Sequence, residues 1–450
     1  MRIDPAFAEN LIKHCLRLGA DEAEVFQKAA VSMRADARDG ALDAIETDRS
    51  YGFGLRTLTK GRLGFYYSAD AESPEAAVRA ALEGGALTGP DEHLSFPTPG
   101  EAGDLPGVLP DVFDPAVAGV TEAEALKAAC AVEKAARGFD PRIDAIRKAS
   151  ASFASVEYHV SNSHGLARGG ARTSCSASVM VAAREGEDAQ MGYGFASGRH
   201  LRDIDFPAAG ADAARRATGL LGARRITKPL RAMVVLDSLV AAEFLGVLAE
   251  MLDGDNVVKG KSLLAGKTGQ RIISRHLCIV DDGLHSGAPG AIHTDDEGVA
   301  ASRTPLFVDG VLQGFMHSGR SARMLSAIRT GNAMRGGYGS MPAVHPTNLF
   351  IEPCKHALSP DALITEMGTG VLVTDVMGLH TVNPVSGDFS VGVSGMYCEK
   401  GERAYPVREA VLSGNLLEFF MDVQALGTDF RFHGTIGAPS LLIGPAEISS

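Results

Sequence analysis

The stretch from Asn383 to Asp429 constrains the fold of this chain most, because glycine, serine and asparagine interrupt it every few residues. Between these small residues, apolar and polar side chains alternate, which is typical of short strands with one buried face. Gly401-Glu402 is predicted to be the hairpin turn between strands Met396–Lys400 and Arg403–Val407. A short helix is expected over Leu416–Leu426. The stretch therefore predicts a β-rich wall with a glycine-rich rim.

The rest of residues 230–450 has the same character. Short strand-like segments alternate with glycine-rich turns, and Val308-Asp309-Gly310-Val311 carries the Asp-Gly signal of a tight hairpin. Two helices are expected to interrupt the strands, one over Leu239–Leu252 with Ser238 as its N-cap and one over Ser321–Ile328. Residues 230–450 are thus predicted to form a mostly β, barrel-like C-terminal domain.

Residues 1–88 are predicted to form a first unit of helices and antiparallel strands. Apolar residues at helical spacing predict a helix over Phe7–Leu18, and the alternation of Glu24–Arg38 predicts a strand. Lys60-Gly61 is expected to be the hairpin turn between two further strands. Ser73, as an N-cap followed by proline, opens a second helix.

Residues 89–120 are rich in proline and are expected to be an irregular connection. Residues 121–223 are predicted to form a second helix-and-strand unit, which begins with the capping box Thr121-x-x-Glu124 and closes with a helix over Phe206–Leu221. The basic, proline-ended segment Arg224–Pro229 is the predicted boundary to the C-terminal domain. The expected fold class is therefore α+β, an N-terminal mixed helix and antiparallel-sheet region followed by the β-rich domain.

The composition excludes several classes of function. The 450 residues carry a formal net charge of −12, whereas nucleic-acid-binding surfaces are normally basic. The chain has no tryptophan, and its longest apolar stretch contains two glutamates and is too short to cross a bilayer. The six cysteines are widely spaced and form no Cys-x-x-Cys, which together with the absence of a signal-type N-terminus predicts the reduced cytoplasm.

The C-terminal motifs also carry a family resemblance. They are Asn-Pro-Val-Ser-Gly-Asp-Phe-Ser from Asn383, Gly-x-Ser-Gly from Gly392, Gly-Glu-x-Ala-Tyr-Pro-Val from Gly401, Ser-Gly-Asn-Leu from Ser413 and Pro-Ser-Leu-Leu-Ile from Pro439. In this order they resemble the TldD/PmbA family, and more narrowly its PmbA (TldE) branch. The resemblance spans most of the chain. It implies a cytosolic protein of a family in which TldD-type chains carry a zinc peptidase site and PmbA-type chains pair with them.

The resemblance also implies where zinc would be found. TldD-type relatives carry His-Glu-x-x-x-His on the helix that opens the C-terminal domain, and a downstream cysteine completes their metal site. The corresponding helix here offers only Glu243 and Glu250 and no histidine, whereas zinc needs three or four closely held ligands. We therefore expect no catalytic residue, no metal and no cofactor in this chain, with zinc in a TldD-type partner. His433, near the segment of the relatives' cysteine, is expected to be structural.

The glycine-rich rim is the predicted substrate-binding site. Its small residues leave backbone amides and carbonyls open to an extended peptide, which could pair with them as an added strand. A set of tight turns that merely require small residues is the alternative. The candidate substrate-binding residues are Asn383, Pro384, Gly387, Ser390, Gly392, Ser394 and Gly395.

Other candidate sites do not fit their chemistry. His276, His285 and His293 are spaced too widely for one helix face, and the acidic triplet Asp295-Asp296-Glu297 is expected to lie in a solvated loop. Two glycine-rich segments miss the spacing of a phosphate loop by one residue. Ser394 lacks the flanking glycine and helix of a hydrolase nucleophile.

Three functions stay open from the sequence. The chain is either the metal-free subunit that pairs with a TldD-like zinc subunit and encloses unfolded peptides, or a peptide-binding or regulatory homodimer of the gyrase-modulator type. A self-sufficient hydrolase is the third. Neither nucleic acid nor membrane is an expected partner.

Overall fold

The N-terminal half is built on one long antiparallel sheet. The computed structural model describes residues 3–69 and 74–449. The strands are β1 (Glu22–Arg38), β2 (Ala41–Thr59), β3 (Arg62–Ser68), β4 (Ile143–Asn162), β5 (Ala167–Glu185) and β6 (Asp188–Gly198), in the order β3-β2-β1-β4-β5-β6. The hairpin predicted at Lys60-Gly61 joins β2 to β3, and the alternating segments predicted as strands are all strands.

The two N-terminal units expected from the sequence share this sheet. β1 pairs with β4 in unbroken register from Glu24 opposite Asn162 to Ala37 opposite Ala149. Residues 1–88 and 121–223 are therefore joined by backbone hydrogen bonds along a whole strand, which side-chain periodicity cannot show because it reports burial and not which strand is the neighbour. After Arg224–Pro229 no described strand belongs to this sheet.

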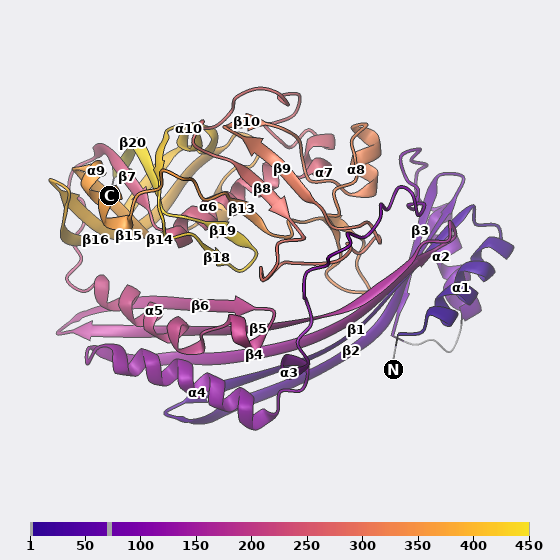
Figure 1. Cartoon of the computed structure of the whole chain (residues 1–450), viewed down its shortest axis with the longest axis horizontal. Coiled ribbons are helices and arrows are strands. Elements are labelled where there is room, and N and C mark those ends of the chain that lie inside the picture. The colour runs from indigo at the N-terminus through magenta and orange to yellow at the C-terminus, as the bar shows by residue number, and fades with distance from the viewer. Residues whose placement is uncertain (1–2, 70–73, 450) are drawn as a thin grey trace.

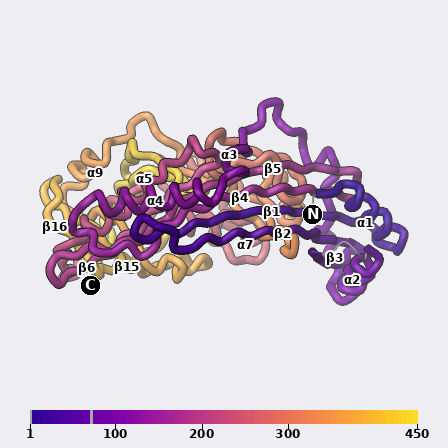
Figure 2. The backbone as a smooth tube through the Cα atoms, turned by 90° about the horizontal axis from the view of Figure 1, so that it is seen from below, coloured from indigo at the N-terminus to yellow at the C-terminus, as the bar shows by residue number. Residues whose placement is uncertain are grey.

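Helices cover the two ends of the sheet with separate apolar cores (Figures 1 and 2). At one end lie α1 (Pro5–Arg17) and α2 (Pro74–Ala86), and at the other α4 (Glu122–Phe139) and α5 (Phe206–Gly219). The predicted capping box of α4 forms as expected. The N-cap predicted at Ser73 lies outside the described residues. Residues 89–120 form the expected irregular connection apart from α3 (Pro115–Ala118), and η1 (Leu201–Asp203) is a short 3₁₀ turn.

The C-terminal domain contains a closed five-stranded barrel and a second sheet, so the mixed helix-and-sheet class and the barrel-like domain are confirmed. The barrel strands are β7 (Leu230–Leu236), β14 (Gly370–Met377), β15 (Asp388–Glu399), β16 (Glu402–Asn415) and β20 (Leu441–Ser449), with β17 (Val423–Leu426) beside β20. The second sheet has the order β10-β9-β8-β13-β19-β18. Its strands are β8 (Ile279–Asp282), β9 (Arg303–Val308), β10 (Val311–Leu312), β13 (Leu349–Ile351), β18 (Arg431–His433) and β19 (Ile436–Ala438), and β11 (Ala333–Met334) pairs with β12 (Ala343–Val344).

Helix α6 (Ser238–Met251) packs against both sheets, in the largest core of the protein. Its N-cap is Asp237, whose carboxylate accepts from the Val240 amide at 2.9 Å, and not Ser238 as predicted. The helix predicted over Leu416–Leu426 ends at Met421 as α10 (Leu416–Met421), and β17 follows. The other short helices are α7 (Gly254–Val258), α8 (Gly319–Met324), α9 (Pro360–Met367) and η2 (Leu379–Thr381). No helix in the described ranges is long and apolar enough to span a membrane.

Candidate functional site

A pocket of about 330 Å³ lies where the N-terminal sheet meets the C-terminal domain. Figure 1 shows β6 running beside β18, with α5 on the N-terminal side and α6 behind. The pocket is lined by Tyr193, Phe195, Asp212, Leu239, Ala242, Glu243, Gly246, His433, Gly434 and Ile436. Because these residues come from β6, α5, α6 and the β18–β19 hairpin, both halves of the chain are needed to form it.

The β6 wall follows from an alternation of small and large residues. A Cβ atom on Gly192 or Gly194 would overlap the carbonyl oxygens of Ala213 or Ala209, so these glycines allow α5 to pack directly on the strand. Tyr193 and Phe195 point to the opposite face of β6, into the pocket. Neither aromatic residue was predicted as a site residue, although the alternation Gly-Tyr-Gly-Phe in the sequence was a usable signal.

Charged residues of α5 and the start of α6 form a network at one side of the pocket. Arg216 forms ion pairs with Asp212 at 3.1 Å and with Asp237 at 3.0 Å, and it also donates to the carbonyl oxygen of Thr374. Burial raises the pKa of Asp237 above its usual value, although Arg216 opposes that shift. The network holds α5 against the N-terminus of α6, and thereby fixes the two walls relative to each other.

Glu243 projects from α6 into this pocket. Among the residues that the structure describes, its carboxylate has neither a hydrogen bond nor an ion pair. Glu243 is exposed at the mouth of the pocket, and the neighbouring side chains enclose its carboxylate only in part. This enclosure, together with the nearby carboxylates of Asp375 and Asp237, raises the pKa of Glu243 to about 7. Glu243 is therefore poised to change charge near neutral pH.

His433 closes the pocket from the β18 side. Its Nε2 atom lies 3.1 Å from the hydroxyl oxygen of Ser238, with which it shares a hydrogen bond. Burial and the neighbouring Arg431 and Arg216 lower the pKa of His433 to about 4, so the imidazole is neutral at physiological pH. It therefore adds no positive charge to a pocket whose unpaired ionisable side chain is a carboxylic acid.

The predicted glycine-rich rim is not an open strand edge. Gly392 and Gly395 lie in β15, which pairs with β14 on one side and with β16 on the other. Ser394 is buried in the same strand. The expectation that an extended peptide could add to the backbone from Gly392 to Gly395 is therefore wrong, because both edges of this part of the strand are already hydrogen-bonded within the barrel.

The beginning of the rim is a turn held by its own hydrogen bonds. The side-chain oxygen of Asn383 accepts from the amides of Val385 and Ser386 at 2.9 and 3.2 Å, and Gly387 has a φ of +79°. Pro384 is half-buried in this turn, and Ser390 is exposed on β15. None of the seven predicted substrate residues lines the pocket beside α6, and a role for the exposed Asn383 and Ser390 in substrate binding stays a prediction.

The acidic triplet is buried, which corrects the expectation of a solvated loop. Asp295, Asp296 and Glu297 are at most 7% exposed. Glu297 forms an ion pair with Arg56 of β2 at 3.1 Å, and Asp296 accepts from the backbone amide of Arg335 at 2.7 Å. Pairing with Arg56 of the other half compensates Glu297, and backbone amides of the C-terminal domain donate to the two aspartates. The sequence alone did not reveal those partners.

The histidines near the triplet have structural contacts instead of shared ligand geometry. His293 donates to the carbonyl oxygen of Pro110 at 2.9 Å, and His285 packs edge-on against Phe350 and Phe432. Over residues 3–69 and 74–449, no three His, Cys, Asp or Glu side chains come together as a metal site would require.

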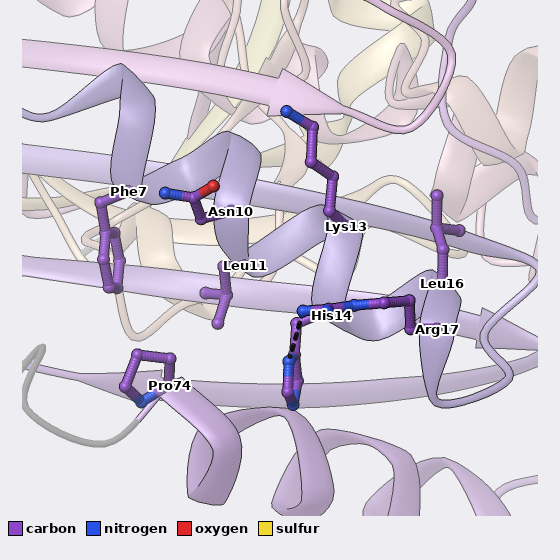
Figure 3. Close-up of a pocket in the computed structure, with 8 residues that line it drawn as sticks. All are labelled: Phe7, Asn10, Leu11, Lys13, His14, Leu16, Arg17 and Pro74. Atoms are coloured by element: carbon purple, nitrogen blue, oxygen red, sulfur yellow. Dashed lines mark hydrogen bonds between the residues drawn. The ribbon is translucent and has the colours of Figure 1, made fainter.

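A larger hollow of about 660 Å³ lies on the outer side of α1 (Figure 3). His14 and Arg17 are joined there by a 3.1 Å hydrogen bond, and Pro74 forms the opposite rim. Pro74 directly follows residues 70–73 in the chain, which lie outside the described ranges. The pocket beside α6 is lined by described residues on all its elements and is therefore the candidate site.

Three family models cover most of the chain in its observed order. The PmbA/TldA metallopeptidase domain 1 matches residues 23–84, the central domain residues 115–221 and the C-terminal domain residues 229–450. The chain belongs to the PmbA/TldA metallopeptidase family. The family predicted from the sequence motifs is thereby confirmed.

Individual relatives agree with this assignment. The chain is 30% identical over 442 residues to the metalloprotease PmbA of Escherichia coli O157:H7, covering 96% of this chain and 92% of that protein. In fold it is similar to TldE from Thermococcus kodakarensis, with a TM-score of 0.88 at 22% identity over 99% of this chain and 100% of the other. It is also similar to a protein from Thermotoga maritima described as a modulator of DNA gyrase, with a TM-score of 0.89 at 23% identity over 98% and 99% of the two chains.

The pocket residues do not fit the zinc that the family description implies. If Glu243 occupies the glutamate position of the TldD-type His-Glu-x-x-x-His motif, Ala242 and Val247 stand at the two histidine positions. Neither side chain has a donor atom for zinc. The histidine at this pocket, His433, shares its Nε2 with Ser238. In that alignment the glutamate of the motif is present and its two histidine ligands are replaced.

Proposed function

We propose that this chain is the metal-free, PmbA/TldE-type subunit of a cytosolic peptidase that processes unfolded peptides. In this proposal a TldD-type partner supplies the zinc and the catalytic residues. This chain supplies part of the wall that encloses the peptide. It takes no step in peptide-bond hydrolysis itself.

The observation that carries the proposal is the pocket beside α6. The pocket lies between the two halves of the chain and contains Glu243. The side chains of Ala242 and Val247, however, cannot bind a metal. A hydrolase that acts on its own would need either a metal-bound water or an activated nucleophile. The similarity to the metalloprotease PmbA of E. coli O157:H7 and to TldE of T. kodakarensis supports the peptidase context.

The test compares the purified chain alone with the chain purified together with a TldD-type partner from the same organism. Zinc is measured by mass spectrometry, and cleavage with unfolded peptides that carry a fluorophore and a quencher. We expect no stoichiometric zinc and no cleavage for the chain alone, and both for the pair. Treatment of the pair with a chelator, followed by removal of the chelator, provides the matched metal-free control.

Two results would contradict the proposal. Zinc close to one ion per chain in the isolated protein, bound by its own residues, would make it a metallopeptidase. A stable homodimer that binds peptides and gains neither zinc nor cleavage from the partner would favour the peptide-binding or regulatory alternative. Light scattering of the isolated chain and of the mixture distinguishes these states.

A further inference from the structure

The pocket beside α6 has walls suited to the stem of a long side chain. Tyr193 and Phe195 form one wall, and Leu239, Ala242 and Ile436 contribute apolar surface on the other. Tyr193 is 48% exposed although its aromatic ring lines a cavity, so its apolar surface is available for contact. Side chains such as lysine and arginine place their methylene groups against surfaces of this kind and keep only the charged end in a polar environment.

The α6 side of the pocket carries a carboxyl group that has no ion-pair partner among the described residues. Asp212 and Asp237 are matched by Arg216, and Asp212 also pairs with Arg215 at 2.5 Å. Glu243 has no such partner among the described residues. Asp375 on β14 forms no ion pair there either, and burial raises the pKa of its carboxyl group. Of these four carboxyl groups, Glu243 and Asp375 have no ion pair with an arginine among the described residues, and Glu243 is the one of the two that lines the cavity.

We propose that this pocket binds the cationic side chain of a lysine or arginine in an unfolded peptide, with Glu243 as its ionic partner. The proposal rests on the proposed function for the presence of a peptide, and it adds a sequence preference that resides in the metal-free subunit. Apolar walls accept the stem, and the unpaired carboxylate accepts the charged end. A charge-assisted hydrogen bond to a carboxylate in such a partly enclosed site is stronger than a neutral one.

Binding is coupled to the ionisation of Glu243. The groups that face it are Asp237 from the start of α6, Asp375 from β14, Asp212 and Arg216 from α5 and His433 from β18. Burial and the carboxylates of Asp375 and Asp237 raise its pKa to about 7, and the histidine is neutral, so the carboxyl group becomes negatively charged as the pH rises through neutrality. A bound ammonium or guanidinium group favours the carboxylate. Affinity for a cationic peptide is therefore expected to rise between pH 6 and pH 8.

The experiment uses the full chain without a partner and four labelled peptides of glycine and serine. Each carries one central residue: lysine, arginine, the neutral isostere norleucine or glutamate. Fluorescence anisotropy at pH 8 is expected to show the lysine and arginine peptides binding about tenfold more tightly than the norleucine peptide, as one charged hydrogen bond would give. Glu243→Gln is expected to remove this preference and its pH dependence while norleucine binding persists.

Glu250→Gln is the matched control, because Glu250 lies two turns along the same helix, is exposed and does not line the pocket. It should retain the preference. Equal affinity for lysine and norleucine peptides, a preference that survives in Glu243→Gln, or no binding of any peptide would each overturn the inference. The assay requires neither zinc nor cleavage, so its outcome is independent of whether a partner activates peptidase activity.

Discussion

At the scale of single residues, Glu243 combines features that rarely occur together on a solvent-reachable carboxyl group. It has no ion-pair partner among the described residues, the carboxyl groups of Asp237 and Asp375 lie near it, and its pKa is raised to about 7. Functional sites are where such shifts concentrate. Because its pKa is raised, the ionised form of Glu243 lowers the free energy of unfolding. This loss can be measured.

Glu243→Gln is expected to stabilise the protein above pH 7 and to leave stability unchanged at pH 4. The unfolded chain loses the Glu243 proton near 4.5, whereas the folded protein retains it until about 7. Since the folded state binds more protons in that window, the wild type loses stability as pH rises through it. Thermal unfolding of both proteins at pH 4, 6 and 8 measures the difference. A variant that melts with the wild type at pH 8 would show that Glu243 ionises there without cost.

Some features of single residues could be predicted from the sequence, and others could not. The lack of histidine in the helix that carries Glu243 was evident, because it depends only on residue type. The buried position of Glu297 was not, since it depends on Arg56, which lies 241 residues earlier in the chain. The pocket could not be predicted from the sequence either, because it forms only where β6 and α6 lie side by side.

At the scale of elements, β15 illustrates how a motif can be recognised while its geometry is misjudged. The Gly-x-Ser-Gly segment was predicted to form a rim and lies instead in the middle of a barrel strand. Alternation identified the strands, hairpins and most helices because it reports which side chains are buried. It contains no information on whether a strand is an edge, so the openness of the backbone could not be predicted.

Two glycines of β15 are expected to respond differently to alanine. At Gly395 a Cβ atom would overlap the carbonyl oxygen of Leu372. This oxygen belongs to the backbone of the neighbouring strand β14, so it cannot shift as a flexible side chain could. Gly395→Ala should therefore reduce the free energy of unfolding by about 1–3 kcal/mol, as overpacking does.

Gly392→Ala is the matched variant. The nearest neighbour of its new Cβ is the Met377 side chain at 3.6 Å, an ordinary contact, and stability should be nearly unchanged. Urea unfolding of the two variants gives the comparison. If both variants lost the same free energy of unfolding, the close approach of β14 would not be the reason for glycine at position 395. Peptide cleavage by the assembled pair should be normal for Gly392→Ala, because no peptide strand can add at this position.

At the scale of the whole molecule, a buried ionic network joins the two halves of the chain. Arg56 of β2 binds Glu24 of β1 at 2.7 Å and Glu297 of the C-terminal domain at 3.1 Å. Arg335 of the C-terminal domain also binds Glu24, and both of these side chains are fully buried. Glu24 and Arg56 pair within the N-terminal sheet, whereas the pairs of Arg56 with Glu297 and of Arg335 with Glu24 exist only while the halves remain docked.

Arg56→Met is expected to reduce the free energy of unfolding by about 3–5 kcal/mol, because it leaves buried carboxylates with fewer partners. Arg79→Met is the control. Its ion pair with Glu75 is exposed and joins residues one helical turn apart, and such pairs contribute about 0.3–0.5 kcal/mol. Urea unfolding followed by tyrosine fluorescence and by circular dichroism measures both. A loss below 1 kcal/mol for Arg56→Met would show that the halves dock without this network.

The pairing of β1 with β4 has a consequence for synthesis on the ribosome. β1 ends at Arg38 and its neighbour begins at Ile143, so the first three strands are complete while the strand that covers their edge is still untranslated. At 5–20 residues per second, the hundred or so intervening residues take roughly 5–20 s. During that time a long strand edge is open to other nascent chains. Slow codons placed between these two strands should therefore lower the yield of soluble protein without altering the finished molecule.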